Sequence, residues 1–240
     1  MPRDVKPAVT HLLFDFFGTL VDYSDSRTEQ GYQASHRLLI RAGAELDYAG
    51  FLKLWSTVVE EFDRAADQST REFSMSEVVR AFLSRMFDSA PSETLVGEFV
   101  DLYLSEWNRG VRYPEGIQQL LGRLAERFEL AIITNTHDPM LVPRHLSCMG
   151  VAELFRAVVT SVEYGLRKPN PAIFQHTLKL LGVSAERCLY VGDNFEADYQ
   201  GALSAGIRPV LIDPDWRHPV PNRDRVRSIL ALDEILPRIS

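Results

Sequence analysis

The sequence predicts an α/β fold in which a doubly wound parallel sheet carries an inserted bundle of helices. Short apolar runs alternate with helical patterns through the second half of the chain, as in parallel sheets whose strands are joined by helices. Between residues 24 and 112, by contrast, long amphipathic patterns place apolar residues at helical spacing. We therefore expect two domains, an α/β core of residues 1–23 and 113–240 and a helical domain of residues 24–112.

Five apolar runs have the length of buried parallel strands, and several end in a polar or glycine-rich turn. These runs are residues 9–15, 130–134, 157–160, 187–191 and 209–212. The predicted helices of the core are residues 114–128, 140–149, 171–181 and 196–205. The prolines between residues 213 and 221 predict an irregular loop, and residues 230–239 predict a final short helix or turn.

The inserted segment contains about four predicted helices, beginning with residues 32–40. In the second helix, Phe51, Trp55 and Val58 share one face. Ser74 and Glu77 have the spacing of a capping box, which predicts the start of the third. A last apolar pattern covers residues 95–107.

Polar side chains follow several of the predicted strands. Asp15, Thr134 with Asn135, and Asp193 each stand at the end of an apolar run, and Lys168 lies just before a helix. Ligands of open parallel sheets bind at the carboxyl ends of the strands. A carboxylate there can act as a nucleophile, and two carboxylates offer the hard oxygen ligands that Mg²⁺ prefers. Lysine and threonine would neutralise charge on a transferring phosphoryl group.

Four segments, in this order, resemble the motifs of the haloacid dehalogenase (HAD) superfamily, with a helical cap inserted between the first and second. They are residues 15–20 (Asp-Phe-Phe-Gly-Thr-Leu), residues 132–135 (Ile-Ile-Thr-Asn), Lys168 before Pro169, and residues 192–198 (Gly-Asp-Asn-Phe-Glu-Ala-Asp). The resemblance covers nearly the whole chain. It implies a Rossmann-like core and a hydrolase that uses an aspartyl nucleophile.

The resemblance also assigns roles to individual residues. Asp15 would be the nucleophile, Thr134 would bind a phosphate oxygen, and Lys168 would balance the charge of nucleophile and phosphate. Asn135, through its backbone, and Thr19 would help to bind the substrate. A small phosphorylated metabolite is the expected substrate, and the expected enzyme is a monomer or homodimer.

A magnesium site is implied by the same motifs. Its ligands would be Asp15, Asp193 and the backbone carbonyl of Phe17, and Asp198 would be either a further ligand or a residue that supports the ligands. The motifs therefore predict a Mg²⁺-dependent phosphatase.

Phe17 departs from the phosphatase pattern, in which a second aspartate of the first motif serves as general acid and base. Phenylalanine cannot transfer a proton, and such catalysis contributes about 10²–10⁴-fold. One alternative is a 2-haloacid dehalogenase, because halide leaves without a proton and dehalogenases carry an aromatic residue here. Another is an impaired protein of this fold that only binds ligands. Asp193 and Asp198 favour the phosphatase, since they would crowd negative charge beside Asp15 unless a cation were present.

Composition limits the partners and the compartment. A net charge of −7 argues against nucleic acid, which needs a basic face. The two cysteines, Cys148 and Cys188, are too far apart for a typical zinc motif. Residues 1–10 show no signal peptide, and the sequence has no apolar run of membrane-span length. We expect a cytoplasmic protein that does not bind membranes.

Overall fold

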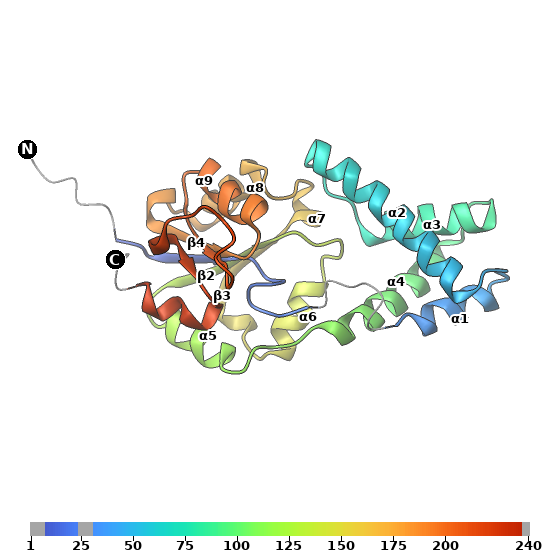
Figure 1. Cartoon of the computed structure of the whole chain (residues 1–240), viewed down its shortest axis with the longest axis horizontal. Coiled ribbons are helices and arrows are strands. Elements are labelled where there is room, and N and C mark those ends of the chain that lie inside the picture. Colours follow the sequence, from blue (N-terminus) through green and yellow to red (C-terminus); the bar gives the residue numbers. More distant parts are fainter. Residues whose placement is uncertain (1–7, 24–30, 237–240) are drawn as a thin grey trace, which may run out of the picture. The chain divides into compact units, whose positions relative to one another are not determined.

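The computed structural model describes residues 8–23 and 31–236, and its chain forms two compact units (Figure 1). One unit contains residues 1–22 and 113–240, and the other contains residues 23–112. Each unit has its own hydrophobic core.

The first unit is built on a six-stranded sheet in which every neighbouring pair is parallel. Its strands are β1 (His11–Phe14), β2 (Glu129–Thr134), β3 (Phe155–Thr160), β4 (Cys188–Gly192), β5 (Arg208–Ile212) and β6 (Arg225–Val226). The predicted fold class and its five strands are thereby confirmed. The sixth strand was not predicted, because two residues give no periodic signal.

The order of the strands, β3-β2-β1-β4-β5-β6, reverses direction at β1. Phe14 at the end of β1 pairs with Ile132 on one side and with Val191 on the other. Along the chain, β2 and β3 are added on one side of β1, and β4 then pairs with β1 on its other side. Doubly wound sheets bind ligands at such a reversal, which here lies at the carboxyl ends of β1 and β4.

Helices cover both faces of this sheet, with α8 and α9 on one side and α5 and α6 on the other (Figure 1). The helices of the unit are α5 (Ile117–Ala125), α6 (Leu141–Cys148), α7 (Ser161–Tyr164), α8 (Pro171–Leu181) and α9 (Gly201–Ser204). Short 3-10 helices occupy Ala152–Leu154, Ala185–Arg187, Asn222–Asp224 and Ile229–Glu234. On the α8 side, Leu13, Ile133 and Tyr190 point from adjacent strands toward Phe174 and form one apolar cluster.

The predicted helix of residues 196–205 is wrong in its geometry. A π-helix, η4 (Phe195–Gln200), precedes the short α9. The Tyr199 amide donates to the Asn194 carbonyl five residues earlier, at 3.2 Å. Such π-turns often occur at functional sites. The final short helix is present as Ile229–Glu234, while residues 237–239 of that prediction lie outside the described residues.

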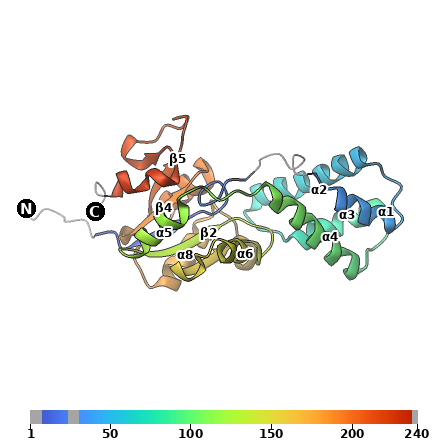
Figure 2. The same cartoon turned by 90° about the horizontal axis from the view of Figure 1, so that it is seen from below.

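Over its described residues, 23 and 31–112, the second unit is a bundle of four helices, seen from a second side in Figure 2. They are α1 (Gln33–Arg41), α2 (Tyr48–Ser69), α3 (Met75–Phe87) and α4 (Glu93–Trp107), followed by a 3-10 turn at Asn108–Gly110. Aromatic rings fill its core, where Trp55 lies 4.5 Å from Tyr103 and 5.2 Å from Phe82, between ring centroids. The capping box of Ser74 and Glu77 is confirmed at the start of α3.

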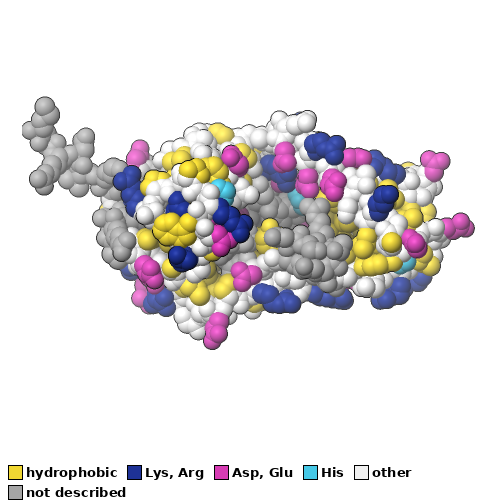
Figure 3. All heavy atoms as spheres, in the orientation of Figure 1, with side chains coloured by type: hydrophobic (Ala, Val, Ile, Leu, Met, Phe, Trp, Pro, Cys, Tyr) yellow, Lys and Arg dark blue, Asp and Glu magenta, His cyan; other side chains and the backbone are white. Residues whose placement is uncertain are grey.

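None of the helices in the described part of the chain combines the length and apolar character needed to cross a bilayer. On the face drawn in Figure 3, acidic and basic side chains are interspersed.

The start of α1 depends on a buried carboxylate from α4. Glu106 accepts hydrogen bonds from the Ala34 amide at 2.8 Å, the Ser35 amide at 2.9 Å and the Ser35 hydroxyl at 2.8 Å. These amides belong to the first turn, which has no carbonyl partners within the helix. Negative charge also complements the positive end of the helix dipole. Glu106 therefore fixes α1 against α4.

Replacing this carboxylate should destabilise the helical unit. Glu106→Ala leaves buried amides without an acceptor, so the free energy of unfolding should fall by about 1–3 kcal/mol. Glu98→Ala is the matched control, since Glu98 lies exposed on the same helix. Urea unfolding followed by circular dichroism measures both variants. Equal stabilities for the two variants would contradict the capping role.

Candidate active site

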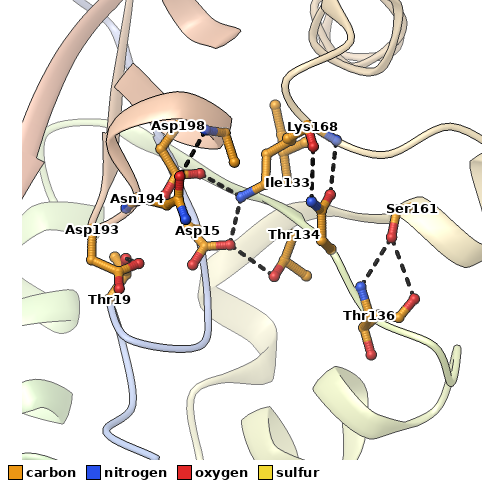
Figure 4. Close-up of polar contacts among 12 residues, drawn as sticks. Asp15, Thr19, Ile133, Thr134, Thr136, Ser161, Lys168, Asp193, Asn194 and Asp198 are labelled. Carbon is orange, nitrogen blue, oxygen red and sulfur yellow. Dashed lines mark hydrogen bonds and ion pairs between the residues drawn. The ribbon is translucent and has the colours of Figure 1, made fainter. Parts of the chain in front are cut away.

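Four of the predicted site residues come together at the carboxyl edge of the sheet (Figure 4). Asp15 follows β1, Thr134 ends β2, and Asp193 follows β4. Lys168 comes from the loop before α8 and reaches Asp15 from the side. The crossover topology thus brings together residues that lie more than a hundred positions apart in the sequence.

Lys168 is the centre of the polar contacts. Its ammonium donates to Asp15 Oδ1 and Asp198 Oδ1, both at 2.6 Å, and to the Tyr190 hydroxyl at 2.8 Å. Three acceptors use all three N–H groups of the ammonium. Burial opposes the charged form, yet Asp15 and Asp198 raise the pKa of Lys168 above its usual value. The lysine is therefore a buried cation held by two carboxylates.

Asp15 is oriented through one of its two oxygens. Oδ1 accepts from Lys168 and, at 2.9 Å, from the Thr134 hydroxyl. Burial raises the pKa of Asp15, and this effect exceeds the opposing effect of Lys168. In the described part of the chain, Oδ2 has no hydrogen-bond donor, so it is the oxygen that can meet a cation or an electrophile.

Asp198 uses both of its oxygens within the protein. Oδ1 accepts from Lys168, and Oδ2 accepts from the Asn194 amide at 2.9 Å. The π-helix turns this side chain back against Gly192, where a Cβ atom would lie 2.3 Å from the Asp198 carboxyl carbon. Only glycine allows this approach.

Asp193 lies beside the loop that follows β1. The Thr19 hydroxyl donates to its Oδ1 at 3.4 Å. Burial and the charges of Asp15 and Asp198 raise the pKa of Asp193 to about 7. Gly18 has a φ of +86°, and a Cβ atom there would lie 2.3 Å from Asp193 Oδ2. The glycine therefore serves both the turn and the close approach of the carboxylate.

Asp15, Asp193 and Asp198 together offer ligand atoms that all lie within 4.8 Å of one another. Within the described residues, the Lys168 ammonium pairs with Asp15 and Asp198, which leaves the cluster with more carboxylates than cations bonded to it. Hard oxygen donors with excess negative charge suit a divalent cation such as Mg²⁺. Burial and the same crowding of carboxylates raise the pKa of Asp193.

Asn135 contacts Lys168 through its side chain. Its amide nitrogen donates to the Lys168 carbonyl at 3.0 Å, and its amide oxygen accepts from the Lys168 backbone N–H at 2.8 Å. The next residue, Thr136, is held by the Ser161 hydroxyl, which accepts from the Thr136 amide at 2.9 Å. The segment after β2 is thus fixed from both sides. The sequence analysis considered only the backbone of Asn135.

Phe17 brings an apolar ring to this edge of the sheet. It packs edge-on against Phe16 and His145, with ring centroids 4.9 and 6.0 Å away. His145 is hydrogen-bonded through Nδ1 to the Tyr113 hydroxyl at 2.9 Å, and burial lowers the pKa of His145. His145, an ionisable residue packed against Phe17, therefore favours its neutral form at neutral pH.

Tyr190 and Asn194 are site residues that the sequence analysis missed. Tyr190 lies in the middle of β4 with its ring fully buried, and burial raises the pKa of its hydroxyl well above the usual value. The tyrosine hydroxyl among the apolar residues of the predicted strand could have indicated this site residue. Asn194 contributes a backbone amide, which no side-chain pattern reveals.

The geometry of Gly18 leads to a stability prediction. Gly18→Ala should reduce the free energy of unfolding by about 1–2 kcal/mol for the left-handed backbone and further for the contact with Asp193. Gly165→Ala is the matched control, because Gly165 has a φ of +89° and open space around it. Urea titration of both variants isolates the contact. Equal losses would contradict a close approach of Asp193.

Comparisons with known proteins agree with this architecture. The family model of haloacid dehalogenase-like hydrolases matches residues 9–206. Glyceraldehyde 3-phosphate phosphatase of Methanopyrus kandleri is 31% identical over 204 residues, which are 84% of this chain and 82% of that protein. Phosphoserine phosphatase of Thermus thermophilus is 32% identical over 138 residues, 58% of this chain and 55% of that protein.

A solved structure shares the fold across the whole chain. The 2-haloacid dehalogenase from Pseudomonas syringae pv. tomato superposes with a TM-score of 0.74 at 24% identity, covering 97% of this chain and 100% of that one. With the sheet topology, the grouped motif residues and the family match, the chain belongs to the haloacid dehalogenase-like hydrolases and is a hydrolase.

Proposed function

We propose that this protein is a Mg²⁺-dependent phosphatase of small phosphorylated metabolites that uses Asp15 as its nucleophile. The observation that carries the proposal is the cluster of Asp15, Asp193 and Asp198, in which Asp15 and Asp198 pair with the Lys168 ammonium. Relatives named as phosphatases of glyceraldehyde 3-phosphate and phosphoserine support phosphate as the reacting group.

Asp15, Asp193 and the backbone carbonyl of Phe17 would hold the magnesium ion. Bound Mg²⁺ would neutralise charge on the phosphate and on the two carboxylates. The sequence analysis also named Asp198 as a ligand. Because both oxygens of Asp198 accept hydrogen bonds, we propose that it orients Lys168 and the Asn194 amide.

The chemical steps follow from the charges around Asp15. Attack of an Asp15 oxygen on phosphorus forms the O–P bond as the bond to the leaving oxygen breaks, which gives an aspartyl phosphate. Water then hydrolyses this acyl phosphate, and Asp15 is regenerated as phosphate leaves. Lys168 and Thr134 would stabilise the charge on the transferring group, and the backbone N–H of Asn135 would bind a phosphate oxygen.

The helical unit would act as the cap that selects the substrate. Loops and domains that cover an active site exclude water and complete the contacts to the substrate. Thr19, beside Asp193, would support the part of the site that meets the phosphate.

Removing the nucleophile should abolish phosphate release. We expect Asp15→Asn to lower kcat on acetyl phosphate and p-nitrophenyl phosphate by at least about 10³-fold. The wild-type enzyme should lose its turnover in EDTA and regain it with Mg²⁺. Asp101→Asn, an exposed change on α4, is the control and should keep full activity. Metal-independent release, or full activity of Asp15→Asn, would refute the proposal.

Phe17 supports a second candidate, a dehalogenase, because halide needs no proton donor. This candidate uses the same Asp15 to displace halide from carbon, forming an ester that water hydrolyses. Its distinguishing result is halide release from short 2-haloacids that persists in EDTA. Without such release the dehalogenase is excluded. A protein that turns over neither class would be the binding module considered from the sequence.

The chemistry of Phe17 also predicts a selectivity among phosphates. Phe17→Asp should raise kcat on an alkyl phosphate at least about tenfold more than on an aryl phosphate, because an alkoxide leaves poorly without a proton. Phe17→Asn is the matched control, since it is similar in size to aspartate but cannot donate a carboxylic proton. Steady-state rates over a series of leaving groups measure the effect. Parallel changes in both variants would assign Phe17 a packing role instead.

A further inference from the structure

The Lys168 ammonium has a third partner that is not a carboxylate. Asp15 Oδ1 and Asp198 Oδ1 each accept one of its hydrogens at 2.6 Å, and the Tyr190 hydroxyl accepts the third at 2.8 Å. These three acceptors are fully or almost fully buried. The hydroxyl therefore completes the coordination of a charge that water does not solvate.

The Tyr190 hydroxyl is itself anchored to the backbone. It donates to the Ile133 carbonyl at 2.8 Å, and Asp198 Oδ1 lies 3.1 Å away. Ile133 lies on β2 and Tyr190 on β4, on the two sides of β1. The hydroxyl thus links the lysine to the residue before Thr134, across the strand that carries Asp15.

The ring of Tyr190 fixes the position of this hydroxyl. It is fully buried in the α8 side of the core, and Phe174 packs edge-on against it with centroids 5.1 Å apart. Both Asp15 and Asp198 attract the ammonium. A rigid third acceptor favours a location between them over a shift toward either one.

We propose that Tyr190 is a positioning residue that holds the Lys168 ammonium between Asp15 and Asp198. The inference rests on the proposed function, in which Lys168 stabilises the transferring phosphoryl group. It concerns this chain's own lysine and not the metal.

Tyr190→Phe tests the proposal because it removes the hydroxyl and keeps the ring. With one N–H unpaired, the ammonium should shift, and kcat on p-nitrophenyl phosphate with Mg²⁺ should fall about tenfold. The KM should change less than about twofold, since the Tyr190 side chain is fully buried. Ile207→Val, a change in the same apolar cluster, is the control for packing, and it should lower the melting temperature while keeping kcat.

A spectroscopic measurement reports on the lysine without turnover. The sequence contains four lysines, Lys6, Lys53, Lys168 and Lys179. In EDTA, a ¹H–¹⁵N spectrum of the side-chain ammonium groups should show a protected signal that Lys168→Arg removes. This signal should broaden or disappear in Tyr190→Phe and persist in Ile207→Val.

The two proposals can fail separately. An unchanged ammonium signal together with an unchanged kcat in folded Tyr190→Phe would overturn the positioning role, even in an active phosphatase. A loss of both in Ile207→Val as well would show that Tyr190 acts only through packing. Full phosphatase activity of Asp15→Asn would overturn the proposed function, while the spectrum in EDTA would still test the contact between Tyr190 and Lys168.

Discussion

The buried ion pair of Lys168 with Asp15 and Asp198 is the interaction on which the site depends. A charge without water must be paired and fully hydrogen-bonded, because removing one partner of such a group costs several kcal/mol. The pairing therefore requires three segments to meet: the end of β1 with Asp15, the loop before α8 with Lys168, and the π-helix η4 after β4 with Asp198. The burial of the Lys168 ammonium thus depends on both the strand order of the sheet and the turns that follow β1 and β4.

The same charges would suit a further cation at this site. Lys168 is bonded to two of the carboxylates, and Asp193 adds a third close by. Glycine at position 18 allows Asp193 to approach the loop after β1, and glycine at position 192 allows Asp198 to fold back. The two glycines thus leave room for carboxylates that repel one another to lie close together. A folded arrangement of this kind favours an ion with hard oxygen ligands.

The sequence alone predicted those site residues whose position follows from local patterns. Asp15 and Asp193 were found because each ends an apolar strand, and parallel strands bring their ends to one edge. The contact of Tyr190 with Lys168 joins residues 22 positions apart, and the cap of α1 by Glu106 joins residues 71 apart at Ser35. Periodicity carries no information on such pairs, because they depend on how elements pack. The π-helix was not predicted for a similar reason, since α-helical and π-helical segments cannot be told apart by their apolar pattern.

Phe17 separates two tasks that the acidic residues of such sites usually share. In the proposed function, charge stabilisation would come from Lys168, Thr134 and a cation held by the carboxylate cluster, whereas position 17 offers no ionisable side chain for proton transfer. His145, whose ring packs against Phe17, has a pKa lowered by burial, so it is a poor proton donor at neutral pH. A site with strong electrostatics and a weak acid accelerates reactions in which the leaving group departs as a stable anion. The chemistry of the leaving group, more than that of the transferred group, should therefore decide which substrates this enzyme turns over.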